Sequence, residues 1–207
     1  MGIEERKERE RLEIRLLIQK AAMEIFIKEG FEKTSIRKIA AEIEYSPSTI
    51  YLYYKDKDDL LLELHREAFQ KMMHSFEQNM QKPDPFDRLK AMGLAYLEYG
   101  FQNPREYELM FLLEAPMEAL NCKEEIWCDG KNAIGLLQNQ IQQCMDAGYF
   151  HSQLNVINAS FFLWSQLHGM VCLHLKKRLM AYESLDPKTL ILDTYQLLLN
   201  LIQHNFK

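Results

Sequence analysis

Hydroxyl, phenol and ammonium side chains gather between positions 46 and 57 of the chain. They include Ser46, Ser48, Thr49, Tyr51, Tyr53, Lys55 and Lys57. Groups of these types donate hydrogen bonds to phosphate oxygens and to the edges of bases. Their density in one short segment indicates a surface that contacts nucleic acid.

Local sequence signals place this segment on a short helix. Ser46 is a suitable N-cap, and Pro47 stands at the first helical position, where its missing N–H has no intrahelical partner to lose. We expect this helix to run from Pro47 to about Tyr54. Thr34 and Ser35 offer the N-cap of an earlier helix. The apolar face of that helix is formed by Ile36, Ile39, Ala40 and Ile43.

A longer first helix is expected to support these two. Its apolar residues follow helical spacing from Leu12 to Ile27, and Gly30 ends it, because glycine suits the left-handed conformation that follows a helix. Residues 4–15 are a dense mixture of Glu and Arg. We favour a solvated helical extension with i,i+4 ion pairs over an arm that contacts DNA.

Three helices joined in this way describe a helix-turn-helix, with the motif at about residues 35–54. Glu44-Tyr45 forms the tight connection between the last two helices. The third helix should bury Ile50 and Tyr54 against the second, so that its polar groups face the nucleic acid. The side chains expected to remain outward are Tyr51, Leu52 and Tyr53.

Two runs of residues in this region resemble the DNA-binding domain of TetR/AcrR-type transcriptional regulators. They are Gly30-Phe31-Glu32-Lys33-Thr34-Ser35-Ile36-Arg37-Lys38-Ile39-Ala40 and Ser46-Pro47-Ser48-Thr49-Ile50-Tyr51-Leu52-Tyr53-Tyr54-Lys55-Asp56-Lys57-Asp58-Asp59-Leu60. The resemblance covers about residues 12–72. It implies a homodimer on a palindromic DNA operator, usually a repressor that a small ligand releases. Glu44 stands where this family often has glycine, and Leu52 replaces a commonly polar residue.

The resemblance also implies which residues contact DNA. Those implied to contact the backbone are Thr34, Ser35, Arg37, Thr49, Tyr53 and Lys57. Those implied to approach the bases are Pro47, Ser48 and Tyr51. Ser46 and Lys55 complete the predicted set, because Ser46 presents a hydroxyl at the start of the helix and Lys55 stands where the backbone would pass.

The rest of the chain is expected to form further helices. Lys82-Pro83-Asp84-Pro85 is the clearest break, and it separates a DNA-binding domain at residues 12–72 from a larger domain at residues 84–207. The expected helices after the third cover residues 60–80, 86–102, 104–114, 121–147, 153–181 and 187–205. The chain is therefore predicted to be all-α with about nine helices. The larger domain is assigned to effector binding and dimerisation.

Aromatic and methionine residues of the larger domain are candidates for an effector pocket. Residues 103–111 and the run Trp164-Ser165-Gln166-Leu167-His168-Gly169 resemble ligand domains of the same family, the second that of a branch with Trp, His and Gly in its ligand domain. The candidates are Tyr96, Tyr99, Tyr107, Met110, Phe111, Trp127, Phe161, Trp164 and His168. Each also suits an ordinary core, and His168 suits a hydrogen-bonded core histidine. We expect a small effector that is apolar or amphipathic.

The last two long helices carry apolar residues on nearly all sides. One chain can cover only part of such a helix, so a second copy of the pair is expected to cover the rest. The candidate interface residues are Phe162, Met170, Leu173, Leu198 and Ile202. A two-fold axis there would also deliver two recognition helices to a palindromic site.

The net charge of −5 is unusual for a protein that binds nucleic acid. Residues 1–55 hold 11 basic and 10 acidic residues, whereas the remainder holds 14 and 20. Any DNA footprint must therefore be a local patch. The charge keeps a rival interpretation open, namely a helical adaptor that binds a partner helix.

No motif indicates catalysis, a cofactor or a metal site, since GxSxG, GxGxxG, HExxH and a P-loop are all absent. The four cysteines form no CxxC pair, and buried inert thiols are favoured over redox sensing. They are Cys122, Cys128, Cys144 and Cys172. No segment resembles a signal peptide or a membrane span, so we expect a cytoplasmic protein without membrane contact.

Overall fold

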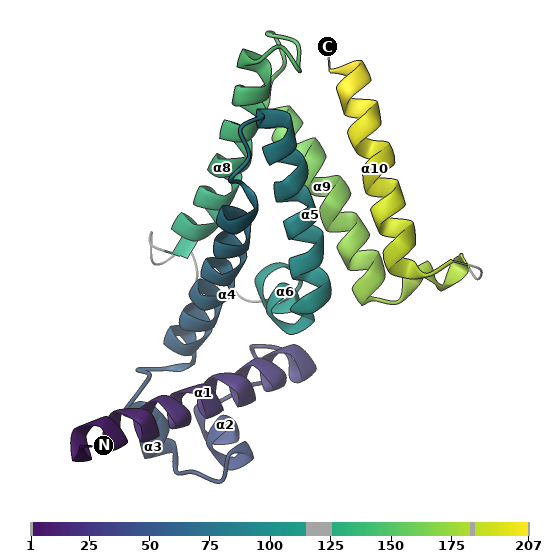
Figure 1. Ribbon diagram of the computed structural model, residues 1–207. Helices are drawn as coiled ribbons and strands as arrows, with labels where there is room; N and C mark the ends of the chain where they lie inside the picture. Colours follow the sequence, from purple (N-terminus) through teal and green to yellow (C-terminus); the bar gives the residue numbers. More distant parts are fainter. Residues whose placement is uncertain (1, 115–125, 183–184, 207) are drawn as a thin grey trace. The chain divides into compact units, whose positions relative to one another are not determined.

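A computed structural model describes residues 2–114, 126–182 and 185–206 (Figure 1). Within these ranges the chain forms nine α-helices and one short 3-10 helix, and it contains no strand. The all-α prediction is therefore confirmed. The side chain of Trp127, one of the candidate pocket residues, lies outside the described part.

The helices have the following bounds. The first four are α1 (Ile3–Glu29), α2 (Ile36–Glu42), α3 (Pro47–Tyr51) and α4 (Lys57–Asn79). The others are α5 (Pro85–Gln102), α6 (Pro104–Phe111), α8 (Ile126–Asp146), α9 (Val156–Leu175), the 3-10 helix η1 (Arg178–Ala181) and α10 (Pro187–Asn205).

The helices pack into two compact units. The first unit takes in the described parts of residues 1–70 and 105–129, and the second those of residues 71–104 and 130–207. Almost all of α6 thus packs with the first unit, although it follows α5 directly in the sequence. The predicted functional division at residues 12–72 and 84–207 stays a prediction.

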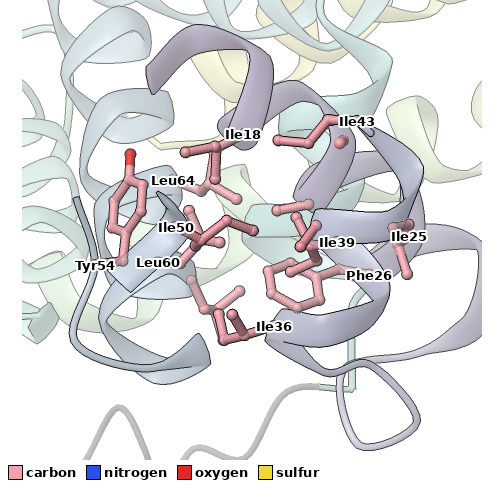
Figure 2. Close-up of a cluster of buried hydrophobic side chains, with 14 of the residues drawn as sticks. Ile18, Ile25, Phe26, Ile36, Ile39, Ile43, Ile50, Tyr54, Leu60 and Leu64 are labelled. Carbon is pink, nitrogen blue, oxygen red and sulfur yellow. The ribbon is translucent and has the colours of Figure 1, made fainter. Parts of the chain in front are cut away.

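One hydrophobic core holds the helices of the first unit together (Figure 2). Four helices contribute buried side chains to it, among them Ile18, Ala22 and Phe26 of α1, Ile39 and Ala40 of α2, Ile50 of α3, and Leu60, Leu61 and Leu64 of α4. Leu109 of α6 joins the same core. Spacings of three and four residues put these side chains on one face of each helix, as the sequence predicts.

Gly30 ends α1 as expected. It adopts φ +86°, a region that L side chains rarely adopt, and its N–H donates to the carbonyl of Phe26 at 2.9 Å. This cap lets the chain reverse and start α2 only six residues later.

In the second unit, α9 packs against α5 and α10 (Figure 1). The hydroxyl of Tyr195 in α10 donates to the carbonyl of Lys90 in α5 at 2.7 Å, close beside Gly93. The guanidinium of Arg88 in α5 donates to the side-chain amides of Gln140 and Gln143 in α8. Polar contacts of this kind fix the register of otherwise apolar helices.

Three predicted helices are shorter in the structure. The expected helix 104–114 ends as α6 at Phe111. The expected helix 153–181 ends as α9 at Leu175, because Lys177 adopts the left-handed conformation with φ +54° and η1 follows as a separate turn. The recognition helix ends at Tyr51, and not at Tyr54. The first residues of the expected helix 121–147 lie outside the described ranges.

Candidate nucleic-acid interface

Hydroxyl N-caps begin both helices of the helix-turn-helix, Ser35 for α2 and Ser46 for α3. The Oγ of Ser35 accepts from the N–H of Lys38 at 3.3 Å, and the Oγ of Ser46 accepts from the N–H of Thr49 at 3.3 Å. Ser46 also bonds to the hydroxyls of Ser48, at 2.7 Å, and Thr49, at 3.0 Å. These bonds satisfy helix donors and order the hydroxyls at the start of α3.

The recognition helix α3 has a buried side and an outward side. Ile50 and Tyr54 are buried in the core, with 0% and 4% exposure, as predicted. Ser48, Tyr51 and Leu52 are exposed, and their spacing of three and four residues places them on one face of the helix. This face can meet base edges while the opposite side fixes the helix on α1 and α2.

Tyr54 occupies the edge of the core. Figure 2 shows its ring against the aliphatic side chains, with the hydroxyl oxygen directed away from the centre. Burial raises the pKa of this hydroxyl, although the nearby Arg15 guanidinium opposes the shift. The phenol therefore stays neutral, and it serves packing and not DNA contact.

The cations around this face differ in their surroundings. Arg37 and Lys55 are exposed. Lys38 forms an ion pair with Glu29. The half-buried ammonium of Lys57 donates to the carbonyl of Phe31 at 3.2 Å and lies 4.2 Å from the centre of its ring. This interaction braces α4 against the chain after α1, and the predicted phosphate contact of Lys57 stays a prediction.

Thr34 requires a correction. Its side chain is only 3% exposed, and its hydroxyl donates to the carbonyl of Gly30 at 2.8 Å. The hydroxyl stabilises the turn between α1 and α2 and is withdrawn from DNA. Ser35, next in the chain, is exposed and remains a candidate.

The remaining predicted contact residues vary in exposure. Ser46 is exposed, whereas Pro47, Thr49 and Tyr53 are half-buried. Tyr53 also packs against the edge of the core, so only part of its ring is free for a backbone contact.

Sequence reasoning missed a polar brace between α1 and α4. The guanidinium of Arg15 pairs with Glu63 and lies 3.3 Å from Glu67, and the Gln19 amide donates to Glu67 at 2.7 Å. The partners on the two helices are 48 or more positions apart in the sequence, so no local pattern could reveal the pairing. The brace therefore holds the N-terminal half of α4 against α1 within the first unit.

Two family descriptions match this chain. "Bacterial regulatory proteins, tetR family" matches residues 18–64, and "Tetracyclin repressor-like, C-terminal domain" matches residues 89–193. The chain belongs to the TetR family. It is therefore a DNA-binding transcriptional regulator and not an enzyme.

Relatives of this TetR-family chain include two bacterial proteins. An uncharacterized HTH-type transcriptional regulator of Haemophilus influenzae is 27% identical over 121 residues, which are 55% of this chain and 65%, slightly under two thirds, of the relative. The fatty acid metabolism regulator protein of Bacillus subtilis is 31% identical over 136 residues, which are 66% of this chain and 70% of that protein. The structure of the fatty acid degradation regulator FadR from Bacillus halodurans shares the fold, with a TM-score of 0.70, 22% identity and coverage of 89% and 94% of the two chains.

A chain of polar contacts links α5 and α9 in the second unit. The indole N–H of Trp164 donates to the Tyr96 hydroxyl oxygen at 3.1 Å, and that oxygen lies 3.4 Å from Nδ1 of His168. Nε2 of His168 lies 3.3 Å from the sulfur of Cys172. Burial lowers the pKa of His168 and raises that of the Cys172 thiol. Both groups are therefore neutral, which suits recognition of an uncharged or amphipathic ligand.

The other candidate pocket residues are divided between the units. Tyr107, Met110 and Phe111 belong to the first unit, where Phe111 contacts Phe69 of α4 with ring centroids 5.8 Å apart. Tyr99 is buried in the second unit. Phe161 is 65% exposed on α9, so its assignment to an interior pocket of one chain is corrected.

An apolar surface runs along α9 and α10 of this TetR-family chain. Its exposed side chains are Ile157, Phe161, Phe162, Leu173, Leu192, Leu197 and Leu201. Leu198 and Ile202, which were expected in a dimer interface, are instead 8% and 3% exposed and pack inside the unit. Both faces of α10 are apolar, so the sequence could not tell the inner face from the outer one.

In the described part of the chain, α9 is the one helix long and apolar enough, by length and composition alone, to cross a membrane. Core helices of water-soluble proteins meet the same criterion. Among the described residues, no three His, Cys, Asp or Glu side chains are grouped so that they could hold a metal ion.

Proposed function

We propose that this chain represses transcription as a homodimer that binds a palindromic operator and is released by a small apolar or amphipathic effector. The observation that carries the proposal is the outward face of α3, with Ser48 and Tyr51 exposed above a closed core. A rigid helix with hydroxyls on its free face is suited to the major groove. Residues 12–72 form the DNA-binding domain in this proposal, and the protein works in the cytoplasm.

Dimerisation follows from the uncovered apolar surface of α9 and α10. A second copy related by a two-fold axis would cover the same surface on both chains. It would also provide two α3 helices for the two half-sites of a palindrome. Phe161 and Leu197, each more than half exposed, are suited to the centre of that interface. Phe162, Met170 and Leu173 remain part of the proposed interface, since none is fully buried.

The effector is proposed to bind the second unit beside Tyr96, Trp164 and His168. Their hydrogen-bonded groups would orient a polar part of the ligand, while neighbouring aromatic rings would contact its apolar part. Occupancy would shift the population of dimers toward a separation of the two α3 helices that no longer matches the operator. The relatives named for fatty acid metabolism and degradation support fatty-acid derivatives as the first effectors to screen.

Selection of bound fragments from a genomic library tests the DNA-binding part. We expect a palindromic sequence to be enriched at low salt. An Arg37→Ala variant should bind every sequence more weakly. The slope of the logarithm of its binding constant against the logarithm of the salt concentration should be smaller by about one unit for each phosphate that it no longer neutralises. Lys131→Ala is the matched control, because this exposed cation lies on α8 in the second unit. Failure to enrich any DNA would favour the helical adaptor instead.

A reporter gene placed behind the selected operator tests the direction of control. Expression should fall when the protein is present and recover when a ligand is added. Tyr96→Phe removes one hydroxyl from the polar chain, so this variant should still repress but need more ligand for release. Increased expression with the protein present would make it an activator.

A further inference from the structure

Leu52 is the most exposed large apolar side chain in the described part of the molecule, at 77%. It caps the C-terminal end of α3, where its N–H donates to the carbonyl of Thr49 at 3.2 Å. It is not part of the hydrophobic core of the first unit. Its position, four residues after Ser48 and one after Tyr51, puts it on the outward face of α3.

The outward face of α3 combines polar side chains with one apolar side chain. Ser48 and Tyr51 carry hydroxyls that can bond to phosphates and to base edges, whereas Leu52 can form no hydrogen bond through its side chain. In the major groove of DNA, the apolar group that a protein can contact is the C5 methyl of thymine. An aliphatic side chain therefore gains free energy on this face where it covers such a methyl group.

We propose that Leu52 contacts a thymine methyl group in each operator half-site and thereby sets base preference at that position. The inference rests on the proposed binding of DNA by α3. It assigns a role to a residue outside the predicted set of DNA contacts.

Exposure by itself does not carry this role, because single exposed leucines are common on protein surfaces. Leu16 on α1 is 60% exposed in the same unit and lies outside the helix-turn-helix. The neighbours of Leu52 on its own helix face carry hydroxyls, so it does not extend an apolar patch on which a protein partner could dock. Leu52 is assigned to base contact because it shares the outward face of α3 with Ser48 and Tyr51, which are proposed to meet base edges.

Replacement of thymine by deoxyuridine tests the proposal, because it removes the methyl group and leaves the hydrogen-bonding edge unchanged. In the selected operator, each thymine is replaced in turn, and binding of the wild-type dimer is measured. In each half-site, replacement at one thymine position should reduce the affinity about fourfold. This is the equivalent of roughly 0.8 kcal/mol for one buried methyl group. Replacement in both half-sites together should reduce it about fifteenfold.

The same replacements are then measured with Leu52→Ala. This variant should bind the thymine operator more weakly and be indifferent to deoxyuridine at that position, and Leu52→Val should lie between it and the wild type. Leu16→Ala is the matched control and should keep the full wild-type sensitivity. Thermal unfolding of all three variants verifies that they fold.

The outcomes separate the two proposals. If the wild type binds an operator but no thymine position depends on Leu52, or if the sensitivity persists in Leu52→Ala, the assignment of Leu52 is wrong and the proposed DNA binding stands. If the wild type binds no DNA under any condition, both fail.

Discussion

The core of the helix-turn-helix in the first unit and the helices α9 and α10 of the second unit differ in how completely the chain covers their apolar residues. In the first unit, the inward residues of α2 and α3, such as Ile39 and Ile50, are fully covered by the chain itself. In the second, Phe161 of α9 and Leu197 of α10 are more than half exposed. The first unit therefore closes the core of its helix-turn-helix by local packing, whereas the second leaves large apolar side chains of α9 and α10 exposed.

The difference reflects what each helix has to pack against. The short helices α2 and α3 lie on α1 and α4, which are long enough to cover their single apolar faces. Helix α9 is apolar on several faces but packs mainly against α5 and α10. Water-exposed leucine and phenylalanine in such numbers favour association.

A charged residue at position 197 should have the largest effect on operator binding, because it places a charge in the exposed apolar surface of α9 and α10 and leaves the core unchanged. We expect Leu197→Glu to give a folded monomer of 24.6 kDa with at least a roughly hundredfold weaker operator binding, since each half-site then binds alone. Sedimentation measures the oligomeric state, and titration with operator DNA measures the affinity. The control Gln196→Glu, on the adjacent exposed residue, should stay dimeric. A dimer that survives Leu197→Glu would contradict the contrast between the units.

Protonation of His65 should destabilise the first unit in acid. Burial lowers the pKa of this imidazole to about 4, and its Nε2 has no hydrogen-bond partner in the described structure. The unfolded chain takes up the proton near pH 6.5 and the folded chain only near pH 4, so stability is lost as pH falls through that window. The loss is roughly 3 kcal/mol.

His65→Phe should remove this part of the pH dependence. Denaturant unfolding of the wild type and the variant at several pH values between about 7 and 4 gives the difference, in which the contributions of the carboxylates cancel. Equal slopes for the two proteins would show that His65 is not buried as the structure has it.

A methyl group at Gly93 should weaken the second unit. A Cβ atom there would lie 2.8 Å from Cζ of Tyr195, so α5 and α10 must move apart or Tyr195 must lose its bond to the Lys90 carbonyl. We expect Gly93→Ala to lower the free energy of unfolding by about 1–3 kcal/mol. Gly135→Ala on α8 has open space around it and should instead gain up to about 1 kcal/mol. Chemical denaturation measures the free energy of unfolding of the two variants. Equal changes in both would refute the close approach of α5 and α10.

The smallest effect is expected at Glu44, in the turn before α3. Glu44 adopts φ +59°, a backbone conformation that favours glycine because L side chains rarely adopt it. Glu44→Gly removes the steric strain but adds flexibility to the unfolded chain, for a net gain of about 0.5 kcal/mol. Glu42→Gly, at the end of α2, should lose about 1 kcal/mol. The midpoints of thermal unfolding measure both changes in stability. A loss of stability in both variants would mean that the turn is not strained.

Much of the fold could be predicted because its signals are local. The N-cap at Ser46 and the positive φ of Gly30 each bond or reverse the chain within four residues, so their residue types predict where helices begin and end. The face of α2 was equally predictable, since its apolar residues occupy one side only. The resemblance of these segments to the TetR family rests on the same local residues.

The tertiary structure alone decided which side of an apolar helix is inside. Leu197 and Leu198 are adjacent and chemically identical, yet one is 56% exposed and the other 8%, because Tyr195 and its neighbours turn that face toward the rest of the unit. A helix that is apolar all round has no period from which to predict its buried side.

Long-range partners were hidden from the sequence for a related reason. The Lys57 ammonium donates to the carbonyl of Phe31, 26 positions away, and the Gln19 amide donates to Glu67, 48 positions away. Residue type shows only that these groups can donate a hydrogen bond. Which acceptor each one finds depends on how the helices pack, because hydrogen-bond geometry tolerates only short distances and narrow angles.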